Sequence, residues 1–292
     1  MLEDTLNLCN EIAYILAQAS LVESYVFKPG NASRFQDLAN VKYIDLVRSA
    51  TLSSQYYREL CVRRVKGIKR IYDTLYDLVI RARRLGFEYQ LFGTYMLLAP
   101  IAYESIAVKD VFSLKRGVGY VLKRLGTDEA GWFIKALREL SLTYLGKLSS
   151  MDYREIENID FFKLMEFSSK YDILALNITN EYFITFEAYK IIKERKCGFE
   201  NDIQRAFIRI LSEYPDTLIF KKYGASVALK VSKFARMISD CPSSHELNLL
   251  NEYLVENRFN PGSTADLIAS ALGIYYLDEW YKKNNFDSRF SM

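Results

Sequence analysis

The sequence predicts an all-α protein, a single compact domain of about ten helices spanning residues 1–292. Glycine and proline, which β and α/β folds use at their many turns, number only 13 and 5 in 292 residues. Apolar residues recur at three- and four-residue steps along most of the chain, and no stretch alternates as a strand does. Long helices joined by few loops explain these observations together.

Nine segments carry the apolar stripe of an amphipathic helix. The clearest is 65–85, and 225–239 and 264–281 repeat its pattern. Looser stripes cover 5–26, 41–60, 92–108, 127–144, 160–192 and 200–212. The segment 145–160 is the best candidate for an irregular connection, and no Gly/Ser-rich or Pro-rich linker divides the chain. We therefore expect one helical domain.

Composition excludes several classes of function. The formal charge of +3 is too small to argue for nucleic-acid binding by itself. No apolar run reaches the 18 or so residues of a membrane span, and the first ten residues have acids where a signal peptide has basic residues, so we expect a cytoplasmic protein. Four cysteines lie far apart without a C-x-x-C pair, which argues against a zinc site and a disulfide framework: Cys9, Cys61, Cys197 and Cys241.

A single histidine, His245 in the loop-like "CPSSHE", excludes His-rich metal sites and argues against a Ser-His-Asp triad. Chemistry here would depend on carboxylates, basic side chains, backbone N–H groups or a hard metal ion. The basic run "RELCVRRVKGIKR" (58–70) and "RARR" (81–84) is interrupted by acids, and Asp77 stands at ion-pair spacing before Arg81. We interpret it as a solvated helix face, with an RNA, DNA or anionic-ligand surface as the alternative.

Four polar clusters are either ordinary turns and helix ends or parts of a site. In "ESYVFKPGNASRFQDL" (23–38), Pro29-Gly30 suits a type II turn, and Glu23 interrupts an apolar stretch. In "YPDTLIFKKYG" (214–224), Asp216 either caps a helix or holds a metal, with Lys221 or Lys222 on phosphate.

The third cluster is "PGSTAD" (261–266). Ser263 and Asp266 fit a capping box, but a helix start after glycine with two hydroxyls is also an anion site. Asp266 would repel phosphate unless a divalent cation lay between them, and Mg²⁺ suits such oxygen ligands. The residues leave both interpretations open. The fourth cluster, 84–105, is a core helix by itself, opened by Gly93.

Together these segments resemble the triphosphoribosyl-dephospho-CoA synthase family, as a divergent member of its archaeal branch, from about residue 15 to 280. "KPGNASRFQD" is similar to the family's Lys-Pro-Gly-Asn signature, and "LLAPIAYE" to its Leu-Leu-Ala-Pro helix. "YPDTLIFKKYG" resembles its Asp-Thr motif, and "NPGSTADLIASAL" its Pro-Gly-x-x-Ala-Asp-Leu motif.

The resemblance implies a reaction between ATP and 3′-dephospho-CoA or a related acceptor. Adenine leaves C1′ of ATP, and the 2′-hydroxyl of the acceptor attacks. It also implies that Glu23 is the general base or stabilises charge at C1′, as carboxylates do in glycoside hydrolysis. Mg²⁺ would be held by Asp37, Asp216 and Asp266. The phosphate-binding residues would be Lys28, Gly30, Arg34, Thr217, Lys222, Gly262, Ser263 and Thr264. A homodimer is left open.

One departure from the family pattern lies before the Leu-rich helix. The family's Asn-Thr-x-x-Gly element corresponds here to Tyr89-Gln90-Leu91-Phe92-Gly93, which keeps only the glycine. Loss of these polar groups predicts either a different acceptor or a catalytically decayed nucleotide-binding or regulatory protein on the same scaffold.

Overall fold

The computed structural model describes residues 2–140 and 159–284. These residues form fourteen α-helices and one 3₁₀ turn, Ser105–Ala107, and contain two isolated β-bridges but no strand. The helices are α1 (Leu2–Tyr25), α2 (Tyr43–Val65), α3 (Asp73–Arg84), α4 (Phe92–Glu104), α5 (Val111–Leu122), α6 (Thr127–Leu140), α7 (Phe161–Ser168), α8 (Ile173–Thr179), α9 (Phe183–Lys193), α10 (Phe199–Glu213), α11 (Thr217–Tyr223), α12 (Ala225–Ala235), α13 (Ser244–Glu256) and α14 (Gly262–Asn284). The all-α prediction is confirmed, but a count of about ten helices is too low.

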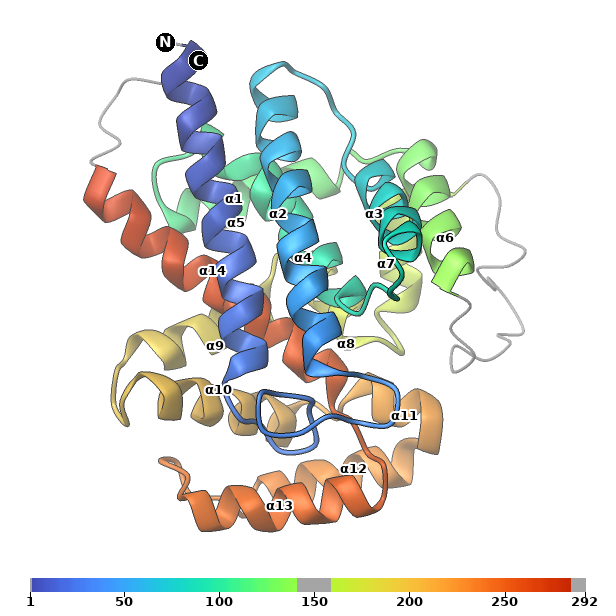
Figure 1. The fold of residues 1–292 in the computed structure, drawn as a ribbon, viewed down its shortest axis with the longest axis vertical. Coiled ribbons are helices and arrows are strands. Elements are labelled where there is room, and N and C mark those ends of the chain that lie inside the picture. The colour runs from blue at the N-terminus through green and yellow to red at the C-terminus, as the bar shows by residue number, and fades with distance from the viewer. Residues whose placement is uncertain (1, 141–158, 285–292) are drawn as a thin grey trace.

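Four long helices organise the molecule (Figure 1). α1 packs along α2 and α14, and α14 also contacts α4, α9 and α10. Helices α3, α6 and α7 lie on one side of this group, while α12 and α13 form one end of the molecule. The chain described here therefore builds one compact helical domain around α4 and α14.

The two central helices are apolar on all sides. Every α4 residue from Thr94 to Glu104 is buried, as are most residues of α14 from Ser263 to Tyr281. A helix that is hydrophobic all round is stable only when other helices enclose it. The interpretation of 84–105 as a core helix is confirmed for α4, and both helices present their first turns at the same end of the core.

The extra helices arise where local signals interrupt a continuous stripe. The segment 160–192 is three helices: Asp172 starts α8 by accepting hydrogen bonds from two backbone N–H groups, and Tyr182, at φ 61°, precedes α9. The segment 65–85 is helical only from Asp73, because Gly67, at φ +71°, follows the end of α2. Helices α5, α11 and α13 were absent from the nine stripes.

The cysteines correct a second prediction. Cys9 is bonded to Cys61, which ties α1 to α2 at a Cα–Cα distance of 5.5 Å. Cys197 is bonded to Cys241 at a Cα–Cα distance of 5.7 Å. Disulfides require proximity and orientation of the two Cβ atoms but no sequence spacing, so the missing C-x-x-C motif did not exclude them.

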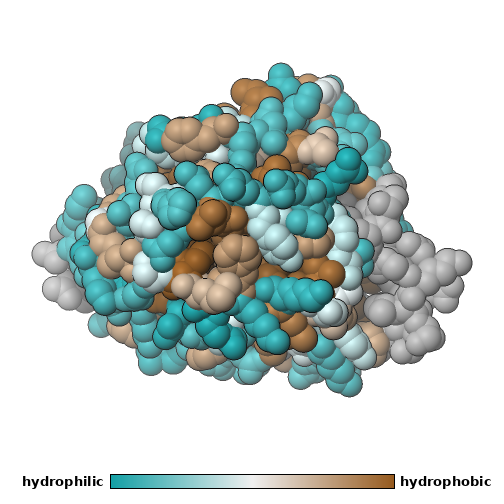
Figure 2. All heavy atoms as spheres, turned by 90° about the horizontal axis from the view of Figure 1, so that it is seen from below, coloured by the Kyte–Doolittle hydropathy of each residue, from teal (hydrophilic) through white to brown (hydrophobic). Residues whose placement is uncertain are grey.

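Two further predictions concern surfaces and connections. Among the described helices, none is long and apolar enough to cross a bilayer. Figure 2, which views the α12 and α13 end of the molecule, shows hydrophobic residues scattered among hydrophilic ones. Exposed apolar side chains on or beside these two helices are Leu229, Met237, Leu249 and Val255. The predicted irregular connection at 145–160 falls almost entirely outside the described residues.

Candidate active site

The first polar cluster folds against the start of the third. Between α1 and α2, Pro29 and Gly30 form the predicted turn: the N–H of Asn31 donates to the Lys28 carbonyl at 3.2 Å, and φ of Gly30 is +73°. A Cβ on Gly30 would lie 2.9 Å from the Phe259 carbonyl and from the Pro261 ring. Only glycine allows this close approach. The turn therefore joins two motifs more than 200 residues apart in the chain.

A buried ion pair lies directly before this turn. Lys28 is fully buried, and its Nζ lies 3.0 Å from Oε1 of Glu23 at the end of α1. The same ammonium donates to the carbonyls of Val26, at 2.9 Å, and of Glu23. Burial raises the pKa of Glu23, although the charge of Lys28 acts in the opposite direction. The two opposite charges compensate each other, so this pair leaves no uncompensated charge in the core.

Asp216 connects two helix ends. Its Oδ1 accepts hydrogen bonds from the N–H groups of Leu218, at 2.9 Å, and Ile219, at 3.1 Å, in the first turn of α11. Its Oδ2 accepts from the N–H and the hydroxyl of Thr264 in α14, both at 2.8 Å. One fully buried carboxylate thus caps α11 and α14 together. Thr217 strengthens the junction by donating to the Ser263 hydroxyl at 3.0 Å.

Asp266 turns toward α4 instead of closing a capping box with Ser263. Its Oδ1 accepts a 2.6 Å hydrogen bond from the hydroxyl of Thr94. A Cβ at Gly93 would collide with its carboxylate, so the glycine kept from the family pattern is what lets α14 and α4 approach here. The two helix starts are thereby joined at one half-buried carboxylate.

The pKa of Asp266 is raised to about 8, first by burial and then by the charges of Glu23 and Asp216, while its bonds to Thr94 act in the opposite direction. The three acids share their surroundings with two ammonium groups. Lys28 is paired with Glu23, and Lys222 feels the charge of Asp216 while burial lowers its pKa. Asp266 therefore retains its proton up to about pH 8, first because burial penalises its charge and then because two other acids lie near it.

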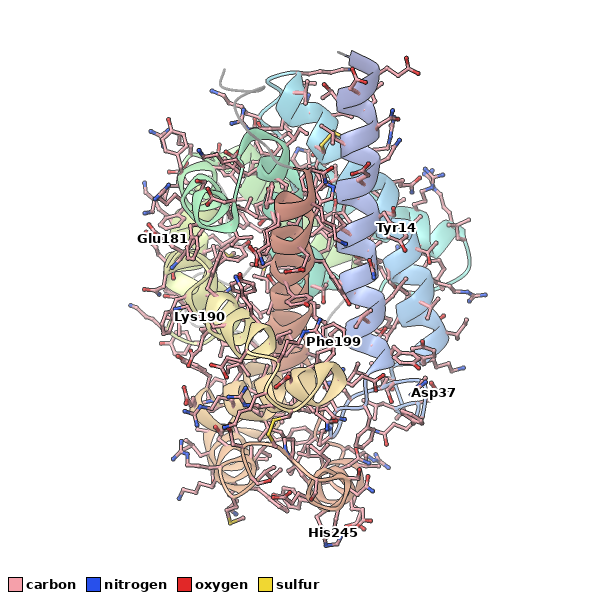
Figure 3. All side chains as sticks on the ribbon, turned by 90° about the vertical axis from the view of Figure 1, so that its left-hand side faces the viewer. Tyr14, Asp37, Glu181, Lys190, Phe199 and His245 are labelled. Carbon is pink, nitrogen blue, oxygen red and sulfur yellow. A yellow bond between two sulfur atoms is a disulfide. The ribbon has the colours of Figure 1, made fainter. Side chains whose placement is uncertain are left out.

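Other predicted site residues are exposed at the surface. Asp37 is exposed and accepts the N–H of Tyr43 at 2.7 Å, at the start of α2 (Figure 3). Arg34 is exposed and stacks on the ring of Tyr25, 3.7 Å from its centroid. The histidine is exposed at the start of α13 (Figure 3).

The described residues contain no group of three or more His, Cys, Asp or Glu side chains spaced to hold a metal. The cluster predicted from Asp37, Asp216 and Asp266 is therefore not formed. Asp37 is occupied as a helix start, and both oxygens of Asp216 already accept two hydrogen bonds each. The hydrogen bonds to Asp266 come from a single residue of the described chain, Thr94.

Sequence reasoning missed the polar residues that complete the site. Thr94 follows Gly93 at the start of a helix, a position that could have indicated a hydroxyl facing another helix end. Asn31 is buried and donates to Asn260 at 2.9 Å, while its own Oδ1 has no partner. Asn251 accepts the N–H of Gly30 at 2.9 Å. Asn31 belongs to the Lys-Pro-Gly-Asn signature but was given no role, and Asn251 comes from a segment that no motif marked.

Fold and site define an all-helical protein in which four helix ends, those of α1, α4, α11 and α14, surround one partly buried carboxylate, Asp266. The family model of the ATP:dephospho-CoA triphosphoribosyl transferases matches residues 9–285. The chain belongs to this family. It is an enzyme that transfers the triphosphoribosyl group of ATP to dephospho-CoA.

A solved structure shows the same fold. A crystal structure from Archaeoglobus fulgidus, provisionally named a triphosphoribosyl-dephospho-CoA synthase, superposes with a TM-score of 0.66 at 21% identity. The match covers 80% of this chain and 99% of the other. No curated protein matches the chain.

Proposed function

We propose that the triphosphate of ATP binds at Asp266 through Mg²⁺, beside the first turn of α14. The observation that carries this proposal is that Asp266 lies near Glu23 and Asp216 at the start of α14, where burial first, and then the charges of these two acids, raise its pKa to about 8. A divalent cation would neutralise these charges and stabilise the ionised form. Bound there, Mg²⁺ would supply charge neutralisation for the triphosphate, which the reaction transfers intact.

The surroundings of Asp266 suit phosphate oxygens. The first turn of α14 points its backbone N–H groups and the positive end of its dipole toward this site. We assign phosphate contacts to Gly262, Ser263 and Thr264, to Thr217 and to the ammonium of Lys222. Asp216 would orient this turn through its bonds to Thr264. Gly30 and Arg34 remain proposed phosphate contacts from the loop between α1 and α2.

Glu23 is proposed to act at C1′ of the ribose. Loss of adenine builds positive charge at C1′, which a nearby carboxylate stabilises. Glu23 lies close enough to Asp266 for its charge to raise the pKa of that group. Lys28 would keep Glu23 oriented through their 3.0 Å ion pair. The acceptor proposed is 3′-dephospho-CoA, although Tyr89 and Gln90 stand where the family pattern has asparagine and threonine.

The proposed location is the cytoplasm, and a homodimer is the proposed assembly. Disulfides are rare in reducing compartments, except in intracellular proteins of hyperthermophiles. The two bonds of this chain therefore favour a cytoplasm of that kind.

The test is release of adenine. Incubation with ATP, Mg²⁺ and dephospho-CoA should yield adenine and the triphosphoribosyl adduct without ADP. Asp266→Asn should lower kcat/KM at least 100-fold, and Glu23→Gln should act mainly on kcat. Asp37→Asn, which removes an exposed carboxylate, is the matched control and should stay within about threefold of wild type. Equal losses in Asp266→Asn and Asp37→Asn would contradict the assignment.

A further inference from the structure

A second concave site lies between α2 and α3, at the basic run. It has a volume of about 510 Å³, within the range of small-molecule sites. Five basic and two acidic side chains line it. It shares no lining residue with the group around Asp266. None of the residues assigned above to the triphosphate, to its metal or to C1′ lines it.

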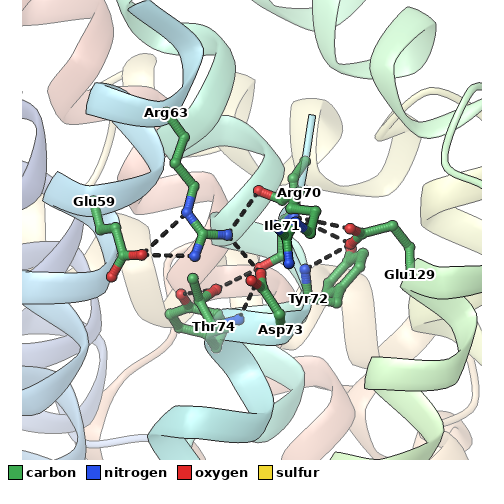
Figure 4. Close-up of polar contacts among 9 residues, drawn as sticks. Glu59, Arg63, Arg70, Ile71, Tyr72, Asp73, Thr74 and Glu129 are labelled. Atoms are coloured by element: carbon green, nitrogen blue, oxygen red, sulfur yellow. Dashed lines mark hydrogen bonds and ion pairs between the residues drawn. The ribbon is translucent and has the colours of Figure 1, made fainter. Parts of the chain in front are cut away.

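The two acidic side chains of the pocket both pair with one arginine, so five basic and two acidic side chains leave the lining a net formal charge of +3. Arg63 lies 2.6 Å from Glu59 and 2.6 Å from Asp73, and it also donates to the Arg70 carbonyl at 3.1 Å (Figure 4). Arg63 therefore serves as a structural bridge. The positive charge that remains in the pocket belongs to the other four basic residues.

None of those four forms an ion pair with a carboxylate in the described part of the chain. Arg58 donates to a neutral group, Oδ1 of Asn10, at 2.6 Å. Arg81 interacts with the hydroxyl of Tyr56. Lys66 and Arg70 are exposed on the loop between the two helices. Four cations around one hollow repel one another, and an anion that binds between them would relieve this repulsion.

The loop that carries Lys66 and Arg70 is fixed from several directions. Glu129 of α6 accepts the N–H groups of Ile71, at 3.1 Å, and Tyr72, at 2.7 Å (Figure 4). The N–H of Ile68 donates to the Arg63 carbonyl at 2.9 Å. A loop held in this way loses little conformational entropy when a ligand binds, which favours affinity.

We propose that this pocket, between α2 and α3, binds a small molecule carrying two or more phosphate groups. Arg58, Lys66, Arg70 and Arg81 would contact the phosphates, since guanidinium and ammonium groups form strong charge-assisted bonds with them. Val62 and Ile68 add apolar surface for an organic portion. The volume of about 510 Å³ suits a small ligand.

Calorimetric titration with ADP and with pyrophosphate tests the proposal, in EDTA so that binding through Mg²⁺ at Asp266 is suppressed. The double variant Lys66→Glu/Arg70→Glu should bind ADP at least tenfold more weakly than wild type. The control, Lys69→Glu/Arg84→Glu, changes the charge equally in the same segment but outside the pocket, and it should stay within twofold. Urea midpoints near wild type should confirm that both variants fold.

The remaining outcomes are decisive. Pyrophosphate binding as tightly as ADP would support recognition of the phosphates alone, and tighter ADP binding would support an added organic contact. Equal weakening in both double variants, or binding only of oligonucleotides, would overturn the pocket in favour of a diffuse basic face. Absence of binding by wild type at millimolar ADP and pyrophosphate would also overturn it. The pocket variant should still release adenine from ATP. Loss of ADP binding can therefore be told apart from a failure of the proposed function.

Discussion

At the scale of single residues, the central feature is a partly buried carboxylate, Asp266, that lies close to two other acids. Asp266 is half-buried beside Glu23 and Asp216, and only Lys28 and Lys222 offset the three acids. The sequence placed an acid in the first turn of a helix but could not show its neighbours. Its pKa depends on residues from three other parts of the chain, so no local pattern could have predicted it.

The pH dependence of stability follows from this residue. The folded-state pKa of about 8 exceeds the ordinary value of 3.8, so the folded state holds a proton that the unfolded state has lost. Without Mg²⁺, the contribution of Asp266 to the free energy of unfolding should therefore fall as pH rises from about 4 to 8.

Urea unfolding of wild type and Asp266→Asn at pH 5 and pH 8 measures this effect. The free energy of unfolding of the variant, relative to that of wild type, should rise by more than about 1 kcal/mol from pH 5 to pH 8, since one pKa unit corresponds to about 1.4 kcal/mol. A difference that does not change with pH would show that Asp266 ionises normally in the folded state.

At the scale of helices, the site exists because the starts of α4 and α11 are both hydrogen-bonded to the start of α14. Asp216 of "PDT" acts as a helix cap. It caps α11 and also accepts hydrogen bonds from Thr264 in the first turn of α14. The sequence predicted most helices, because the apolar stripes are long. It missed the short α11, whose start is set by this cap, and it could not show that the cap reaches another helix.

Asp216→Ala should therefore cost more than an ordinary cap. Loss of an N-cap costs about 1 kcal/mol, and buried donors left without a partner add about 1–3 kcal/mol. We expect about 2–4 kcal/mol from urea unfolding at pH 7. Asp110→Ala is the control, because Asp110 caps α5 alone through Ser113 at 2.7 Å. A loss no larger than that of the control would show that the link to α14 contributes little.

At the scale of the whole molecule, the fold was predictable and the covalent links were not. Scarce glycine and proline and the helical period correctly indicated an all-α domain. The disulfides were missed because Cys9 and Cys61 meet only when α1 packs along α2. The basic run was interpreted as a solvated face, and most of its basic side chains are exposed; part of it also lines a pocket, because the helix breaks at Gly67.

Both disulfides should stabilise the fold. They close loops with sequence separations of 52 and 44 residues, for which the chain-entropy model gives about 4 kcal/mol each. Cys9→Ala/Cys61→Ala should accordingly lower the free energy of unfolding by about 2–4 kcal/mol in non-reducing buffer. In reducing buffer, the variant and wild type should differ by much less. Four reactive thiols in unreduced, denatured wild type would contradict the pairing.

The central claim is that the triphosphate and its metal bind at Asp266. The most direct measurement is a crystal structure with ATP and Mn²⁺ in place of Mg²⁺, in which anomalous scattering locates the metal. The account predicts a metal peak bonded to an oxygen of Asp266, at about 2.1 Å, with the triphosphate against the first turn of α14. A metal and triphosphate bound at Asp37, or between α2 and α3, with Asp266 still bonded only to Thr94, would contradict it.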